Sequence, residues 1–163
     1  MAAVSLSISA IGSCRDMHIN SLIDDYLSRC GKLGPSLGFS AVQLRDGEVN
    51  KRATGQQRIS EEAELLKKLS GAPQCQIVLD ERGKALSTRD FAEYLRKTRD
   101  SGASSIGFLI GGADGHAAAT KKSADLLLSL GPMTWPHMLA RVLLCEQVYR
   151  AMSIMAGHPY HRE

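Results

Sequence analysis

The sequence lacks the features that mark several large classes of protein. It has a single Trp, aromatic residues make up 5% of its 163 residues, and it contains no internal repeat or low-complexity tract. No stretch approaches the roughly 20 uninterrupted apolar residues of a membrane helix. No basic residue precedes the first apolar run, so we expect no signal peptide. The hydrophobic content of 44% excludes an intrinsically disordered chain and predicts one compact domain spanning residues 1–163.

Cysteine is scarce too. Cys14, Cys30, Cys75 and Cys145 are far apart and form no CxxC pair, so the ligand spacing of a zinc site is missing. A domain of this size does not need disulfides, and we expect all four thiols to be structural. Cys75 and Cys145 lie inside apolar runs and should be buried. This usage is typical of a reducing compartment, and we expect a cytoplasmic protein.

The net charge of the sequence is small. The 20 Lys and Arg against 17 Asp and Glu leave a formal charge of +3, which permits a nucleic-acid partner without indicating one. Residues 1–44 carry three basic and three acidic groups and residues 100–163 carry five of each, so the whole excess lies in residues 45–99. Four basic side chains gather at the start of that section: Arg45, Lys51, Arg52 and Arg58.

What is present is a regular alternation of apolar runs and amphipathic stretches. Short apolar runs predict strands at residues 3–11, 37–44, 74–79, 105–110 and 125–130. Apolar residues at helical spacing predict helices at residues 19–30, 60 to about 71, 87–99, 116–124 and 136–155, and the polar stretch 45–59 predicts a loop. The second helix should begin at Ser60, with Glu61 and Glu62 in its first turn. The alternation predicts an α/β fold, with a mostly parallel sheet flanked by helices.

The first candidate site is the segment FLIGGADG, residues 108–115. A buried strand that runs into two glycines places bare backbone at the carboxyl end of the sheet, where α/β proteins bind ligands. The segment is not a P-loop, since no GK[ST] follows, and it is not a GxGxxG dinucleotide fingerprint. On these residues alone, a ligand-binding turn and a plain tight turn between strand and helix are equally open.

The next such turn, LGPMTWP at residues 130–136, also leaves a strand and enters a helix. One glycine and two prolines restrict its shape, and it holds the only Trp. Two stiff neighbouring loops could form a pocket of backbone groups and apolar side chains, which suits a small ligand with an adenine ring. Trp135 could equally fill the core.

The chain ends in HPYHRE, residues 158–163. Histidine exchanges protons near neutral pH and arginine binds phosphate or carboxylate groups, so this tail is a candidate functional segment, with a frayed terminus as the alternative. The preceding helix carries a wide, methionine-rich apolar face, part of which could meet a second subunit. Arg141 lies one turn into that helix, near the expected pocket, whereas His18 and His116 are expected at the surface.

Together, FLIGGADG and the stretch LSLGPMTWPHMLARVLLCEQVYRAMSIMAGHPYHRE resemble the ribosomal RNA large subunit methyltransferase H family of the SPOUT superfamily. The likeness is very specific over about the last 60 residues. The segment QIVLDERGK, the helix at 87–99 and the chain length fit this family too, whereas about the first 60 residues match it only in pattern.

The resemblance implies a small homodimer with an α/β fold whose C-terminal segment is threaded into a trefoil knot. It implies S-adenosylmethionine as the cofactor, bound in the knot, and as the substrate N3 of a pseudouridine in a 23S ribosomal RNA hairpin of the assembled ribosome; no membrane partner is expected. Carried over residue by residue, the cofactor site falls on Leu79, Gly112, Gly131, Pro132, Met133, Thr134, Trp135 and Pro136. The family typically has a small residue or Lys where Pro132 stands, and an aliphatic or aromatic residue where Trp135 stands. These departures should alter pocket detail only.

In this family the tail reaches the active site, and Tyr160, His161 and Arg162 match it. The N3 proton must leave during methyl transfer, which requires a general base or a site that stabilises the anion. The resemblance favours His161 as base or proton relay, Arg162 for charge or phosphate contact, and Arg141 to orient the tail or the RNA. The modest charge fits a structured particle, which two subunits can bind by shape.

Two other functions are open at this point. The main alternative is a non-catalytic nucleotide- or RNA-binding module on an open α/β sheet. An NAD-type oxidoreductase is disfavoured, because the dinucleotide fingerprint is missing.

Overall fold

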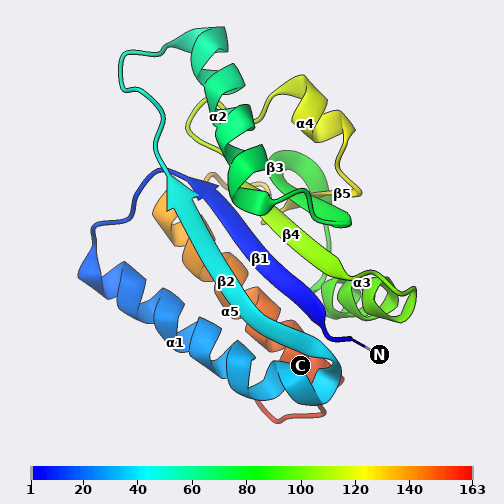
Figure 1. Cartoon of the computed structure of the whole chain (residues 1–163). Helices are drawn as coiled ribbons and strands as arrows, with labels where there is room; N and C mark the ends of the chain where they lie inside the picture. The colour runs from blue at the N-terminus through cyan, green and yellow to red at the C-terminus, as the bar shows by residue number, and fades with distance from the viewer. Residues whose placement is uncertain (1, 163) are drawn as a thin grey trace.

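A computed structural model describes residues 2–162 and contains a five-stranded, wholly parallel sheet (Figure 1). The strands are β1 (Val4–Ile11), β2 (Phe39–Gly47), β3 (Cys75–Ala85), β4 (Ser105–Ile110) and β5 (Leu126–Ser129). They lie in the order β2-β1-β4-β3-β5. Because every neighbouring pair is parallel, the carboxyl ends of all five strands point to one edge of the sheet.

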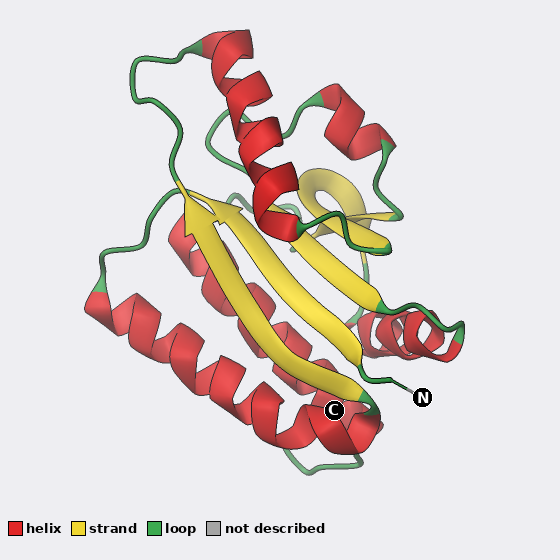
Figure 2. Ribbon diagram, in the orientation of Figure 1, coloured by secondary structure: helices red, strands yellow, loops and turns green. Residues whose placement is uncertain are grey.

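Helices cover both faces of this sheet (Figure 2). On one face, α5 (His137–Met155) lies between α1 (Met17–Leu33) and α3 (Thr88–Asp100). The other face carries α2 (Gly55–Ser70), which packs on β1, β2 and β4, and the short α4 (Ala118–Lys122). The arrangement confirms the predicted α/β fold.

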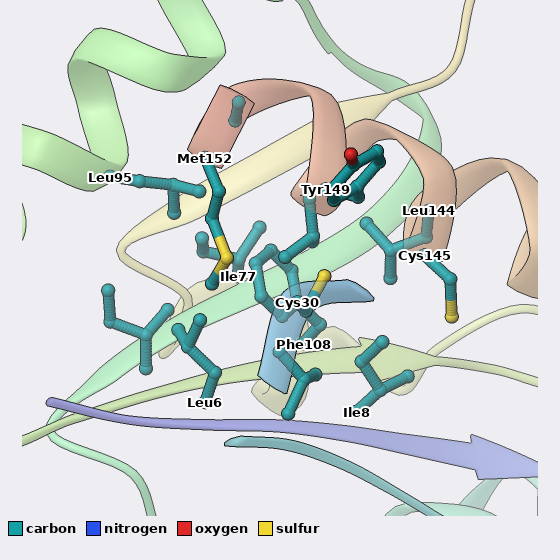
Figure 3. Packing of buried hydrophobic residues seen from close by; sticks show 14 of the residues in the cluster. Leu6, Ile8, Cys30, Ile77, Leu95, Phe108, Leu144, Cys145, Tyr149 and Met152 are labelled. Carbon is teal, nitrogen blue, oxygen red and sulfur yellow. The ribbon is translucent and has the colours of Figure 1, made fainter. Parts of the chain in front are cut away.

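The core lies between the sheet and the layer of α1, α3 and α5 (Figure 3). Ile8 of β1 and Phe108 of β4 are fully buried, and so are Leu144 and Met152 of α5. Burial of such side chains gives each a favourable transfer free energy of about 1.5–3 kcal/mol. The apolar face of α5 is therefore mainly a core face.

The cysteines are free thiols, and three of them are buried. Cys75 and Cys145 are buried as predicted, and Cys30 lies in the core with them. Burial raises the pKa of the Cys30 and Cys145 thiols to about 12, so both are protonated and unreactive at neutral pH.

Local sequence signals set several element ends. The Asp16 carboxylate accepts hydrogen bonds from the backbone N–H groups two and three residues further on, at 2.8 and 3.1 Å, and caps α1. Ser87 caps α3 by accepting the Asp90 N–H at 3.1 Å. A turn of 3-10 helix, η1 (Gly34–Leu37), links α1 to β2.

Two predicted boundaries are wrong by about five residues or more. Helix α2 begins at Gly55, after an extended Thr54, so Glu61 and Glu62 lie in its second turn rather than its first. Strand β3 continues to Ala85 instead of ending at Leu79. In both cases the stretch is polar and contains glycine. Such a stretch is as compatible with a loop as with the helix or strand that forms there.

The extension of β3 depends on a partner that is distant in sequence. Residues 77–79 pair with β5, residues 80–83 arch outward, and Lys84 then pairs with Leu128 again (Figure 2).

The trefoil knot implied by the family resemblance stays a prediction. Within residues 2–162, no helix is both long and apolar enough to cross a membrane.

Candidate functional site

A cavity of about 430 Å³, here called the large cavity, opens at the carboxyl edge of the sheet beside β3, β4 and β5. Four segments form its walls: the end of β3 with its arch, the turn after β4, the turn after β5 and the first turn of α5. Its size suits a small organic ligand. The two turns singled out in the sequence therefore meet at one site.

Two glycines form the wall after β4, and a side chain on either would displace a neighbouring side chain. A Cβ on Gly112 would lie 2.6 Å from Oε1 of Glu62, and a Cβ on Gly111 would lie 3.1 Å from Cε1 of His116. Gly115, with a φ of +77°, closes the turn by donating its N–H to the Gly112 carbonyl at 3.1 Å. The turn is tight and presents bare backbone to the large cavity.

The turn after β5 is held by its own hydrogen bonds. The Ser129 hydroxyl donates to the Gly131 carbonyl at 3.0 Å and accepts the Gly131 N–H at 3.2 Å, while Gly131 has a φ of +108°. Met133 and Trp135 line the large cavity and are 71% and 41% exposed. Trp135 is therefore a cavity residue and not a filler of the core.

The arch of β3 contributes Gly83 and an acid, Asp80, that forms an ion pair. A Cβ on Gly83 would lie 2.7 Å from the backbone of Leu127, so only glycine lets the arch pass this close to β5. The Asp80 carboxylate accepts hydrogen bonds from Nζ of Lys121 and from the Arg82 N–H, each at 2.8 Å. Burial alone would raise the pKa of Asp80, but these hydrogen bonds outweigh it and lower the pKa.

His116 lines the large cavity, and the prediction that it lies at the surface is wrong. It is 8% exposed, with its ring against Gly111. Burial lowers the pKa of the imidazole, so the ring is neutral at pH 7 and offers one donor and one acceptor. His18, by contrast, is exposed as predicted.

A second hollow of about 200 Å³, here called the Glu62 hollow, opens at the ends of β1 and β2. It is lined by Ile11, Gly12, Glu48, Val49, Asn50, Lys51, Arg58 and Glu62. Because Glu62 lies against Gly112, which also lines the large cavity, the two hollows adjoin at the Gly111–Gly112 turn.

The Glu62 hollow holds an unpaired acceptor among cationic groups. Glu62 is 5% exposed, and its Oε2 has no hydrogen-bond partner among the described residues. Burial raises the pKa of Glu62, Arg58 and a backbone hydrogen bond from Gly112 oppose this shift, and Asp114 adds to it. Nη1 of Arg58 lies 4.0 Å from Oδ2 of Asp114, and its Nη2 donates to the Lys51 carbonyl at 3.4 Å.

Arg141 is fully buried and faces the strand ends. Its Nη1 donates to Oδ2 of Asp46 at 2.6 Å, and its Nη2 donates to the carbonyls of Ile11 and Gly12 at 3.0 and 2.6 Å. It thus ties the ends of β1 and β2 to α5. Since Ile11 and Gly12 line the Glu62 hollow, Arg141 shapes the wall of that hollow and not of the large cavity.

The tail packs along α5 of its own chain. The ring centroids of Tyr160 and Tyr149 are 4.7 Å apart. The Tyr160 hydroxyl donates to Oε1 of Glu146 at 3.1 Å, and the Arg150 guanidinium lies 4.8 Å from the centroid of the Tyr160 ring. Desolvation raises the pKa of Tyr160, which keeps the phenol protonated at neutral pH. Glu146 is nine residues beyond His137, about 14 Å along the helix.

The last residues of the tail are less enclosed. His161 is half-buried, with Nδ1 covered and without a hydrogen-bond partner in the described part of the chain, and Arg162 is exposed. Glu163 of the HPYHRE motif lies outside the described residues.

The structure brings most of the predicted cofactor residues together and keeps the predicted catalytic residues apart from them. Six of the eight predicted cofactor positions line the large cavity: Leu79, Gly112, Gly131, Met133, Thr134 and Trp135. Pro132 and Pro136 are not among its lining residues but belong to the turn that forms the wall. None of the four predicted catalytic residues lines it: Arg141, Tyr160, His161 and Arg162.

Sequence reasoning missed two buried polar residues at this edge, Glu62 and His116. Each lies against one of the paired glycines, within reach of a Cβ that would clash. The paired glycines Gly111 and Gly112 are the sequence signal for these residues. They indicate that other side chains pack closely against the backbone, but they do not indicate which ones.

The chain is similar over nearly its whole length to proteins of one kind. The family model described as "Predicted SPOUT methyltransferase" matches residues 4–161. A protein of Cereibacter sphaeroides (strain KD131 / KCTC 12085), named ribosomal RNA large subunit methyltransferase H, is 45% identical over 159 residues, which cover 98% of this chain and 99% of that protein. A protein of the same name from Ruegeria pomeroyi is 45% identical over 157 residues, covering 96% and 98%.

The fold is similar to that of a solved structure, a probable methylase family protein from Haemophilus influenzae Rd KW20. The TM-score is 0.50 at 11% sequence identity, and the match covers 99% of this chain and 71% of the other. At this identity the likeness concerns the fold alone.

Proposed function

Since the chain belongs to the SPOUT methyltransferase family, together with proteins named ribosomal RNA large subunit methyltransferase H, we propose that it methylates 23S ribosomal RNA with S-adenosylmethionine. The acceptor is N3 of a pseudouridine, and the substrate is the assembled ribosome in the cytoplasm. The observation that carries the proposal is the large cavity, in which two glycine turns and the end of β3 converge at the carboxyl edge of a parallel sheet.

The residues of the large cavity fit S-adenosylmethionine. Leu79, Leu128 and Trp135 offer apolar surface for an adenine ring, and the backbone around Gly112 and Gly131 offers fixed hydrogen-bonding groups. The bound cofactor supplies an electrophilic methyl group. The role of the chain is to hold the acceptor in line with that group and to exclude water, so much of the rate enhancement comes from positioning.

The active unit in this proposal is a homodimer. Met133, Trp135 and Leu139 expose 71%, 41% and 42% of their surface at the turn before α5 and in its first turn, and a second copy would cover this apolar patch. The tail packs on α5 about 14 Å beyond His137, so it serves the site of the partner subunit rather than its own.

Within that composite site, His161 accepts or relays the N3 proton and Arg162 contacts a phosphate or the developing charge. Tyr160, protonated at neutral pH, packs on Tyr149 and holds the tail. Arg141 orients the strand ends that face the RNA.

The proposal is tested by methyl transfer from labelled S-adenosylmethionine to ribosomes that lack the mark. We expect labelled N3-methylpseudouridine in digests of the 23S RNA, and calorimetry should detect binding of S-adenosylmethionine. A folded protein that binds RNA but neither binds the cofactor nor transfers the methyl group would support the non-catalytic module instead.

The role of the tail needs a separate test. Substitution His161→Ala should lower turnover by about 10²–10⁴-fold and leave cofactor binding nearly unchanged, while His18→Ala on exposed α1 should change neither. Mixed dimers of a His161→Ala chain with a Gly83→Ala chain, whose large cavity should be distorted, should regain activity. Mixed dimers without activity would place the tail in the site of its own chain.

A further inference from the structure

Glu62 is a buried acid, and one of its two carboxylate oxygens, Oε2, has no hydrogen-bond donor in the described chain. Its side chain is on the face of α2 that packs on the sheet, and its Oε2 makes no hydrogen bond within residues 2–162. Arg58, one turn earlier, lies near Asp114 and the Lys51 carbonyl. An unsatisfied buried carboxylate costs stability, so its presence here points to a donor supplied by a ligand.

The space beside Glu62 suits a flat ring. Ile11 and Val49 contribute apolar surface to the Glu62 hollow, and Gly12, with a φ of +95°, contributes backbone without a side chain. A volume of about 200 Å³ is less than half that of the large cavity. The ligand is therefore smaller than the one that the large cavity takes.

The rim of the Glu62 hollow is suited to a phosphate backbone. Lys51 and Arg58 line the hollow, and Arg52 is exposed on the same loop. These cations contact phosphates of an RNA strand without regard to sequence, whereas the buried acceptor selects for a particular donor. A flat ring with an N–H donor, joined to phosphates, is a nucleotide, which under the proposed function belongs to RNA.

The position of Glu62 brings such a base next to the large cavity. Its Oε1 lies 2.6 Å from the position of a Cβ on Gly112, and Gly112 also lines the large cavity. A base bound against Glu62 thus lies at the turn that borders the large cavity, where its N3 can approach the methyl donor directly.

The chemistry of the two possible pyrimidines decides which N–H meets the carboxylate. In uridine, N1 carries the ribose, so the ring has one N–H, at N3. In pseudouridine the ribose is attached at C5, and the ring keeps both N1–H and N3–H. When N3 accepts the methyl group it faces the large cavity and loses its proton, so only N1–H is free to bind a fixed acceptor.

We propose that the Glu62 hollow binds the target base and that the Glu62 carboxylate accepts a hydrogen bond from N1–H of pseudouridine. Glu62 is then the residue that determines the preference for pseudouridine over uridine. This inference rests on the proposed methyltransferase function and deepens it. Uridine has no N–H group at the position of N1–H. When uridine binds in the Glu62 hollow, the Glu62 carboxylate therefore receives no hydrogen bond from the base.

The test compares two ribosomal particles that differ only in whether the target nucleotide is pseudouridine or uridine. We expect the wild-type enzyme to prefer pseudouridine in kcat/KM by about tenfold or more, because a site built around a hydrogen bond disfavours the analogue that lacks it. In Glu62→Ala the preference should fall to about threefold or less, through loss of rate on pseudouridine. Glu62→Gln keeps an acceptor oxygen without the charge and should give an intermediate ratio.

A direct measurement accompanies the kinetics. An RNA hairpin with ¹⁵N-labelled pseudouridine, bound in the presence of S-adenosylhomocysteine, should show its N1–H proton shifted downfield with the wild-type protein and not with Glu62→Ala. The matched control is Glu64→Gln, on the exposed face of α2, which should keep the wild-type ratio and spectrum. Calorimetry with S-adenosylmethionine verifies that each variant is folded.

Failure of the inference and failure of the proposed function look different. The inference is overturned if the wild-type enzyme methylates both particles equally, if Glu62→Ala keeps the wild-type ratio, or if Glu62→Ala loses both activities in proportion while still binding the cofactor. A wild-type enzyme that binds the particles but methylates neither overturns the proposed function itself.

Discussion

The two hollows adjoin at the Gly111–Gly112 turn but differ in how their acids are paired. The large cavity combines glycine backbone, apolar side chains and charged groups, and its acid Asp80 is paired with Lys121. The Glu62 hollow has apolar surface with charged groups at its edge, and Oε2 of its buried acid has no hydrogen-bond partner within residues 2–162. The first suits a ligand with its own hydrogen-bonding groups, and the second needs a ligand that supplies a donor and negative charge.

The hollows also differ in what supports them, and the largest expected effect concerns the Glu62 hollow. Arg141→Met removes the donor to Asp46 and to the carbonyls of Ile11 and Gly12. We expect the free energy of unfolding to fall by about 3–5 kcal/mol, because buried partners are left unpaired. Denaturant unfolding measures the loss.

The control for this variant lies on the same helix. Arg150→Met breaks a pair with Glu146 that is partly exposed, and should cost about 1 kcal/mol or less. Equal losses for the two variants would mean that Arg141 has no special role in holding the strand ends.

The second largest expected effect concerns the large cavity and should leave the Glu62 hollow less affected. Gly83→Ala places a Cβ 2.7 Å from the backbone of Leu127, which cannot move aside as a side chain can. We expect a loss of about 1–3 kcal/mol in unfolding free energy and weaker binding of S-adenosylmethionine, with binding to ribosomes less affected. Denaturant unfolding, calorimetry and ribosome co-sedimentation report these three quantities.

Gly31→Ala is the matched control. The nearest atom to a Cβ there is 4.0 Å away, inside α1, so this variant should gain about 0.5–1 kcal/mol. Unchanged cofactor affinity in Gly83→Ala would show that the arch of β3 does not shape the large cavity.

The third effect is electrostatic. Lys51→Ala and Arg58→Ala should weaken binding to the ribosome, and each should lower the slope of log K against log salt by about 1. The affinity for S-adenosylmethionine should not change, because neither residue lines the large cavity. Lys32→Ala, in the last turn of α1, is the control and should keep the wild-type slope.

The smallest effect concerns the charge of Glu62. Burial raises its pKa in the folded state, so its contribution to stability is present at low pH and is lost as the pH rises through the folded pKa. Glu62→Gln should therefore raise the free energy of unfolding at pH 8 by about 1 kcal/mol. The gain should shrink toward zero at about pH 4, where Glu62 is protonated in the folded protein. A gain of equal size at both pH values would contradict a titration effect.

Much of the fold could be predicted because its elements carry local signals. Ile8, Phe108 and their strand neighbours form apolar runs, and Ser87, at the predicted start of a helix, caps α3. The strand order and the last part of β3 could not be predicted, since the pairing of Lys84 with Leu128 is a contact between segments distant in sequence.

The candidate site divides in the same way. Gly112 and Trp135 could be predicted as candidates because a double glycine after a strand and a Trp in a proline-containing turn are visible in the sequence itself. Glu62 has the sequence context of an ordinary acid near a helix start, and only the packing of α2 on the sheet shows that it is buried. The helix that carries Arg141 is predicted correctly, but the direction of its side chain depends on the ends of β1 and β2.

The ion pair between Arg141 and Asp46 has a consequence for biosynthesis. The two residues are 95 positions apart, and Arg141 belongs to the last helix of the chain. At about 5–20 residues per second, translation adds Arg141 roughly 5–20 s after Asp46. During that interval β1 and β2 lack the group that ties their ends. The hollow proposed to bind ribosomal RNA is therefore completed only after α5 has been synthesised.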